Sequence, residues 1–308
     1  MSVSAARAQL FDLPAVGPPV AVERGSSPRD LELSEEGPNE PGERAEAPAA
    51  PLPAPPAVET PRFGDPRLRV RRPDLSGRPR LRFLASPDFP PFTSLDGRGR
   101  PVGYNVELVR GLCEALDALD RCQLQILPWG QLRGALARGD GDAIIAGLAV
   151  TAEAREELNF TEPYMRFPAR FAARAGSGFD PQRAAGARVG VVARTAHEAM
   201  LRSLFPGLSV EALPDEAELQ RRLAAGEVDA AFGDGVRLAG WLATPQGRCC
   251  GFAGGPYLSE HYLGRGLTIA TRAGDAELVE ALDWALGRMA DTGRMEEIYL
   301  RSFPVSFF

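Results

Sequence analysis

Two stretches of the chain, LARGDGDAII at residues 136–145 and LAAGEVDAAF at residues 223–232, share one pattern. Each reads Leu-Ala, one further residue, Gly, two more residues, and then Asp-Ala before two apolar residues. The pattern predicts a short helix that ends at a glycine, a two-residue turn and an apolar strand. This is the helix-to-strand half of a βαβ unit, and parallel strands need such crossovers. Two copies therefore predict two similar α/β lobes.

The glycines and aspartates of the two copies have ordinary structural explanations. Gly139 and Gly226 suit the left-handed conformation at a helix C-terminus, which glycine adopts readily. For Asp142 and Asp229 we favour a role in the turn or strand start over ligand contact. Binding chemistry is expected after the strands, because open α/β sheets bind ligands beyond the carboxyl ends of their strands.

Composition bounds the class of protein. The 308 residues are 44% hydrophobic and 25% charged, which is enough apolar material for one or two globular domains. The net charge of -6 argues against a strongly basic nucleic-acid binder. No run of about 18 apolar residues occurs, so no membrane-spanning helix is expected.

Residues 1–78 differ from the rest of the chain in composition and in apolar pattern. They are rich in proline and lack periodic apolar spacing, which predicts a disordered extension. A secretory signal needs a basic start and an apolar run of about 7 to 15 residues. The opening MSVSAARAQLFDLPAVGPPVAVERG has no such run, so the sequence shows no recognisable export signal and a cytoplasmic location stays open.

From about residue 80 onward, strand and helix signals alternate. Strands are expected at 81–86 and 123–129, and a helix at 104–119 has apolar residues on one shared face. A short helix is expected at 131–137 and should end at Gly139.

Six motifs then appear in a fixed order: DFPPF (88–92), GRPVGYNVEL (99–108), GDAIIAGLAVT (141–151), NFTEPY (159–164), RVGVVART (188–195) and DAAFGDGVRLAGWL (229–242). Together they closely resemble the bacterial family of extracellular solute-binding proteins for polar amino acids. The closing segment, from GGPYLSEHYLGRG to EEIYLRSF, also resembles that family. The resemblance covers roughly residues 80–305.

The resemblance implies a clamshell of the type II periplasmic-binding-protein fold. Each lobe would be a mainly parallel sheet flanked by helices, and two crossing strands would form the hinge. We assign residues 79–170 and 264–308 to lobe 1 and residues 171–263 to lobe 2. The outward crossing would be FPARFAARA (167–175), and the return would be GRGLTIATR (264–272).

The function implied by the resemblance is capture of a small polar molecule between the lobes. The ligand would be an amino acid or a related carboxylate, delivered to an ABC permease in the periplasm. We expect a monomer without cofactor or metal ion, and neither an enzyme nor a nucleic-acid binder.

The resemblance also suggests which residues touch the ligand. From lobe 1, Phe89 would form a stacking wall, and the main-chain N–H groups of Gly147 and Ala149 would face the ligand. From lobe 2, Asp234 would bind the ligand ammonium group, and Thr195 would bind through its hydroxyl and neighbouring N–H groups. Two alternatives stay open: Phe89 as core packing and Thr195 as a helix cap.

The chain departs from the family where the ligand carboxylate is bound. The family has Thr followed three residues later by Arg, whereas here Thr151 is followed by Ala154, with Arg155 one step further. One helical step rotates a side chain by about 100°. Arg155 is our first candidate for the carboxylate, with Arg194 and Arg170 as alternatives.

Two further departures concern small residues. Ala149 stands where family members often have a serine, so one side-chain donor is missing. Arg194 stands where a glycine usually precedes the threonine, and it either replaces the missing charge or obstructs the site.

The cysteines and histidines add little chemistry of their own. Some family members have a disulfide at the corner where Cys113 and Cys122 stand, and the alternative is two buried thiols. Cys249 and Cys250 are adjacent and have no zinc-site spacing around them. The two histidines are too few for a histidine-rich site, and His197 fits either the cleft or a helix surface.

Two other function classes remain. A ligand-poor adaptor or sensor of the same fold, such as one in periplasmic alcohol oxidation, fits the three departures. An enzyme similar to cyclohexadienyl dehydratase would need a general acid, for which only Asp234 is distinctive. The chain has no GxSxG motif, and it has no lysine for a phosphate-binding loop.

Overall fold

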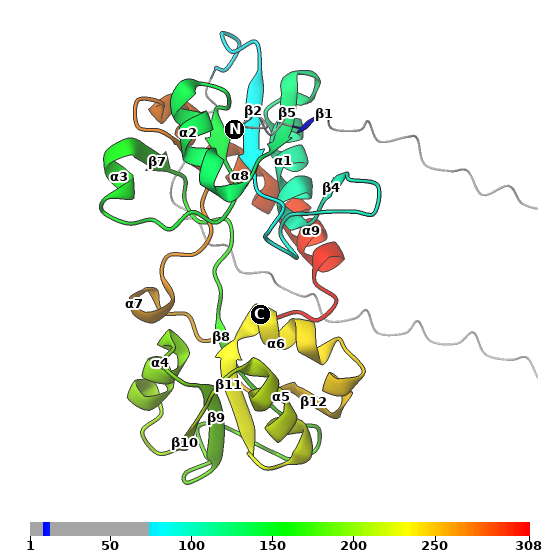
Figure 1. Cartoon of the computed structure of the whole chain (residues 1–308), viewed down its shortest axis with the longest axis vertical. Coiled ribbons are helices and arrows are strands. Elements are labelled where there is room, and N and C mark those ends of the chain that lie inside the picture. The colour runs from blue at the N-terminus through cyan, green and yellow to red at the C-terminus, as the bar shows by residue number, and fades with distance from the viewer. Residues whose placement is uncertain (1–8, 13–73) are drawn as a thin grey trace, which may run out of the picture. The chain divides into compact units, whose positions relative to one another are not determined.

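The chain folds as a two-lobed α/β protein, as the sequence predicts. The computed structural model describes residues 9–12 and 74–308, which belong to one compact unit (Figure 1). Their strands form two large sheets and a short hairpin of β3 (Ser94–Leu95) and β4 (Pro101–Val102). Each large sheet belongs to one lobe.

The first sheet has the strand order β1-β5-β2-β6-β13-β7. Its strands are β1 (Gln9–Asp12), β2 (Leu81–Ala85), β5 (Cys122–Ile126), β6 (Ala143–Ile144), β7 (Leu158–Phe160) and β13 (Ala270–Arg272). β2 pairs in parallel with β5 and β6, and the other ladders are antiparallel.

Helices cover both faces of this sheet. The helical elements are α1 (Tyr104–Ala115), η1 (Leu119–Arg121), η2 (Trp129–Gln131), α2 (Leu132–Arg138), α3 (Ala154–Glu157), α8 (Ala276–Asp291) and α9 (Arg294–Ser302). Figure 1 shows the C-terminal α8 and α9 beside α1, and their apolar faces share one core with β2 and β5. The buried residues of α2 form a second core on the other side.

The second sheet has the order β10-β9-β11-β8-β12. Its strands are β8 (Ala169–Arg174), β9 (Arg188–Val192), β10 (Ser209–Leu213), β11 (Ala230–Asp234) and β12 (Cys250–Phe252). Its helical elements are α4 (Ala196–Leu204), α5 (Glu216–Ala225), α6 (Gly235–Leu242), η3 (Gln246–Cys249) and α7 (Glu260–Leu263). α4 packs on one face of the sheet, and α5 and α6 pack on the other.

Both sheets repeat one strand order. In the first, β5-β2-β6 is followed by antiparallel β13; in the second, β10-β9-β11 is followed by antiparallel β8. Each repeated sequence phrase is the crossover into the third parallel strand, as predicted. Both sheets are mixed, because β13 and β8 enter antiparallel from the segments that cross between lobes and not through a helical crossover.

Each predicted crossing segment contributes one residue to an isolated bridge. Isolated bridges join Met165 to Leu267 and Ala169 to Tyr257. The predicted outward crossing contains β8, a strand of the second sheet, and the predicted return contains β13, a strand of the first. The lobe boundaries at residues 170 and 264 remain our proposal.

The turns of the two sequence copies are built alike. Gly139 and Gly226 have φ angles of 79° and 74°, which place both in the left-handed region. The side chains of Asp142 and Asp229 each accept a hydrogen bond from a main-chain N–H of the neighbouring parallel strand, at 2.9 Å and 2.8 Å. The structural role predicted for both aspartates is confirmed.

Part of the segment expected to be disordered has a defined structure. Residues 9–12 form β1, which pairs with β5 at the edge of the first sheet. Leu75 is buried, and Arg78 forms an ion pair with Asp275. The expectation of disorder is therefore wrong for residues 9–12 and 74–78, and the rest of the segment lies outside the described residues.

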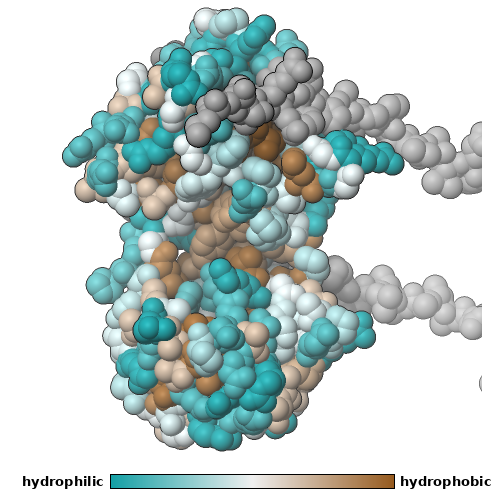
Figure 2. All heavy atoms as spheres, viewed as in Figure 1, coloured by the Kyte–Doolittle hydropathy of each residue, from teal (hydrophilic) through white to brown (hydrophobic). Residues whose placement is uncertain are grey.

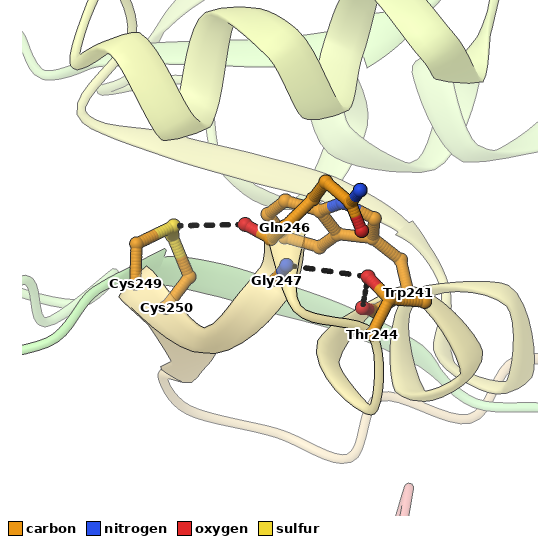
Figure 3. The surroundings of a disulfide bond; sticks show 6 residues. All are labelled: Trp241, Thr244, Gln246, Gly247, Cys249 and Cys250. Atoms are coloured by element: carbon orange, nitrogen blue, oxygen red, sulfur yellow. Dashed lines mark hydrogen bonds between the residues drawn. A yellow bond between two sulfur atoms is a disulfide. The ribbon is translucent and has the colours of Figure 1, made fainter.

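Two disulfides connect neighbouring elements. Cys113 in α1 is joined to Cys122 at the start of β5, with 6.2 Å between their Cα atoms. Cys249 is joined to Cys250 where η3 meets β12 (Figure 3). In the turn before this pair, Gly247 donates its main-chain N–H to the hydroxyl of Thr244. The second disulfide packs against one core of the second lobe.

The visible surface is mostly hydrophilic. Figure 2 shows one face, where hydrophobic atoms gather mainly in the middle of the view. No helix within the described ranges is long and apolar enough to cross a membrane.

Candidate functional site

The loop after β2 positions Phe89. Its ring stacks on Phe92 with 4.8 Å between the ring centroids, and its main-chain N–H donates to the carbonyl of Thr93. The Thr93 hydroxyl accepts from buried Asn105, which fixes the loop on α1. Phe89 itself is only half-buried, so part of the ring remains available to a ligand.

Phe89 and Gly147 lie together, although 58 positions separate them in the sequence. Gly147 has a φ angle of 76°, and a Cβ atom there would lie 3.1 Å from the Phe89 ring. Glycine is required at this close approach. Ala149, two residues further on, is exposed.

The short helix α3 decides where Arg155 points. The Thr151 hydroxyl accepts a hydrogen bond from the main-chain N–H of Ala154, whose side chain is buried. Arg155 is exposed, and its guanidinium carbon lies 6.0 Å from the centre of the Phe160 ring. Among the described residues it forms no ion pair. The one-residue step thus sends the cation in a different direction from the buried side chain of Ala154.

Arg194 is exposed and adopts a left-handed conformation with a φ angle of 61°. A residue other than glycine pays about 1 kcal/mol or more in this region, which explains why glycine suits the position. Its main-chain N–H donates to the side chain of Glu198 at 2.7 Å. This bond fixes the start of α4 and leaves the guanidinium in solvent.

Arg170, the third candidate for the carboxylate, is buried on β8. One guanidinium nitrogen donates to the carbonyl of Phe307 at 2.9 Å, and the guanidinium carbon lies 4.3 Å from the Phe252 ring centre. Arg170 therefore binds the C-terminal segment of the chain.

Asp234 and Thr195 both cap helices at the carboxyl edge of the second sheet. Asp234 ends β11 and accepts a hydrogen bond from the main-chain N–H of Arg237 at 2.9 Å. The Thr195 hydroxyl accepts from Glu198 N–H at 3.2 Å and donates to the carbonyl of Val192 at 2.7 Å. The predicted capping role of Thr195 is confirmed.

Both side chains line one cavity of about 430 Å³. Its walls combine apolar and charged residues: Val192, Thr195, His197, Glu216, Leu219, Gln220, Phe232, Gly233, Asp234, Arg237 and Leu238. All of them come from the second lobe.

Negatively charged side chains outnumber positively charged ones around this cavity. Glu216 pairs with Arg237 at 2.9 Å, whereas Asp234 bonds only to a main-chain N–H in the described part of the chain. Burial lowers the pKa of His197, although Asp234 and Glu216 act in the opposite direction, so His197 is neutral at pH 7. Two carboxylates against one guanidinium leave the cavity with a formal charge of -1.

The structure thus brings Thr195 together with Asp234, and Phe89 together with Gly147. Three polar residues that line the cavity were not predicted from the sequence: Glu216 and Gln220 in α5 and Arg237 in α6. A signal existed for Glu216, because α5 begins just after the carboxyl end of β10, at the edge where such sheets bind ligands. No group of three or more His, Cys, Asp or Glu residues in the described ranges could hold a metal ion.

Known proteins resemble this chain over the same region. The family model for bacterial extracellular solute-binding proteins, family 3, matches residues 81–305. A putative ABC transporter arginine-binding protein 2 of Escherichia coli is 29% identical over 223 residues, which cover 72% of this chain and 90% of that protein.

Solved structures show the same architecture. The second substrate-binding domain of Lactococcus lactis GlnP, in an open conformation, has a TM-score of 0.63 at 16% identity, over 77% of this chain and all of that domain. An ancestral cyclohexadienyl dehydratase also has a TM-score of 0.63, at 20% identity over 75% of this chain and 95% of the dehydratase. At these identities the likeness shows the fold alone.

Proposed function

Because this chain belongs to the bacterial extracellular solute-binding proteins, family 3, we propose that it captures a small polar molecule for an ABC-type transporter. The ligand is an amino acid or a related carboxylate. The observation that carries the proposal is the cavity of about 430 Å³ that Thr195 and Asp234 line. Small-molecule sites typically measure about 300 to 1,000 Å³.

In this proposal the ligand touches both lobes. Phe89, Gly147 and Ala149 contact it from lobe 1, and Thr195 and Asp234 contact it from lobe 2. Ligand contact with both lobes stabilises the closed state, which open lobes sample without ligand. Arg155 is the residue proposed for a ligand carboxylate, and for that role it has to leave the Phe160 ring.

The partner, the location and the absence of catalysis belong to the same proposal. Relatives such as the E. coli protein are named as ABC-transporter binding proteins, and others as periplasmic. We therefore propose a periplasmic monomer that delivers its ligand to permease subunits without changing it chemically.

A thermal-shift screen of the purified full chain tests the proposal. The panel consists of amino acids, small carboxylic acids and amines at millimolar concentration. A ligand at about 100 times its Kd adds about 2.7 kcal/mol, which raises the melting temperature by a few degrees. If no compound of the panel raises the melting temperature, the result contradicts solute capture and favours the adaptor or sensor.

A further inference from the structure

The cavity of the second lobe is anionic, and its one cation is already paired. Glu216 and Asp234 face the cavity, and Arg237 is held by Glu216 at 2.9 Å. Neutral His197 adds no charge at pH 7. A carboxylate that enters this cavity meets net repulsion, whereas an ammonium or guanidinium group meets a net charge of -1 carried by Asp234 and Glu216.

The three arginines considered for a ligand carboxylate lie outside this cavity. Arg170 is buried against Phe307 and Phe252. Arg155 lies over Phe160, and the guanidinium of Arg194 is exposed to solvent. None of these three guanidinium groups lines the cavity.

Apart from Arg155, which lies over the Phe160 ring, the contacts proposed from lobe 1 are uncharged. Gly147 and Ala149 offer main-chain groups, and Phe89 offers the face of an aromatic ring. An aromatic face attracts a cation through its quadrupole. Both sides of the site therefore favour a ligand with positive charge, because Arg237 is already paired with Glu216 and Arg155 lies over Phe160.

We propose that the site recognises its ligand through cationic nitrogen groups anchored by Asp234 and Glu216, and that a ligand carboxylate is dispensable. The ligand class then includes amines that lack an α-carboxylate. This inference rests on the proposed function and names the ligand class of the same cavity. A desolvated cation needs an opposite charge beside it, and the two carboxylates meet that need.

Matched ligand pairs test the inference by isothermal titration calorimetry on the full chain. The pairs are lysine with cadaverine, arginine with agmatine, and histidine with histamine, where each amine is the amino acid without its carboxylate. We expect the amine of at least one pair to bind within fivefold of its amino acid. If the amino acids bind and every amine is weaker by more than fivefold, the inference is overturned and solute capture stands.

The inference is also overturned if none of the six compounds binds. If another compound of the thermal-shift panel binds in that case, solute capture survives. If nothing binds in either assay, both proposals fail.

A pair of variants tests the role of Glu216. Glu216→Gln should weaken the best-binding amine at least threefold. Glu227→Gln removes the same charge from an ion pair of the same length, Glu227 to Arg221 at 2.9 Å, but lies outside the cavity. It should change affinity by less than 1.5-fold. Equal losses in both variants would show a general charge effect and overturn the assignment of Glu216.

Discussion

Asp142 and Asp229 occupy equivalent places in the two lobes, yet their surroundings differ. Each accepts a main-chain hydrogen bond from an arginine of the neighbouring strand, Arg82 or Arg188. The side chain of Asp142 is 9% exposed, and that of Asp229 is 48% exposed. Antiparallel β13 brings Arg272 to 3.5 Å from Asp142, whereas Asp229 has only Arg188, at 3.9 Å, among the described residues.

The ends of the following strands differ as well. β6 leads to Gly147 and Ala149, which carry no charge. β11 ends in Asp234, which lines the cavity beside Glu216. The repeated turn therefore fixes only the backbone, and the residues after it decide which lobe supplies charge to a ligand.

The largest expected effect compares the two turn aspartates. Asp142→Ala should lower the free energy of unfolding by about 3 kcal/mol, because it leaves Arg82 and Arg272 without their shared carboxylate. Asp229→Ala should cost only about 1 kcal/mol, since its ion pair is exposed. Urea denaturation of both variants measures the difference, and equal losses would show that burial does not separate the two copies.

The second prediction concerns the charged end of β11. Asp234→Asn should weaken binding of an α-amino acid or an amine at least tenfold, or about 1.4 kcal/mol, through loss of a charge-assisted bond. The fold should hold, because asparagine caps a helix as well as aspartate does. Calorimetric titration measures the affinity.

Asp215→Asn is the matched control for that variant. Asp215 caps α5 by accepting from Glu218 N–H at 2.9 Å and does not line the cavity. Its substitution should leave affinity unchanged. If Asp234→Asn behaves in the same way, Asp234 is not part of the site.

The third prediction concerns Asp283, a partly buried aspartate that forms no ion pair with an arginine among the described residues. Burial raises the pKa of Asp283 on α8 to about 7, from an ordinary value of 3.8. Because the folded-state pKa is the higher one, the stability falls as the pH rises from about 4 to about 7. Asp283→Asn should therefore stabilise the protein by about 1 kcal/mol at pH 8.5 and hardly at all at pH 4. Melting temperatures at both pH values measure this, and an equal change at both would contradict the raised pKa.

The smallest expected effect concerns His197. Burial holds its pKa below the usual value, so it gains a proton only as the pH falls below about 6.5. The resulting imidazolium competes with a cationic ligand for Asp234 and Glu216, and Arg237 nearby adds to the repulsion. Affinity should fall about threefold between pH 7.5 and 5.0. The fall should disappear in His197→Gln, and its persistence there would assign it to another group.

Local patterns were predictable because they depend on neighbours in the sequence. The helix ends at Gly139 and Gly226 and the crossovers that follow them are where the sequence places them. The cap at Thr195 also depends on residues within three positions. The antiparallel direction of β8 and β13 was not predicted, because it follows from how the chain crosses between lobes.

The sequence by itself determined the two α/β lobes, the repeated turns and the membership of a solute-binding family. These features follow from short-range hydrogen bonds, apolar periodicity and ordered motifs. Only the tertiary structure decided which charges meet. Arg170 contacts Phe307 across 137 positions, and Glu216 lies in the same cavity as Asp234, because the strand order of the sheets brings distant segments together. Burial and ion pairing depend on that order, and no local pattern in the sequence encodes it.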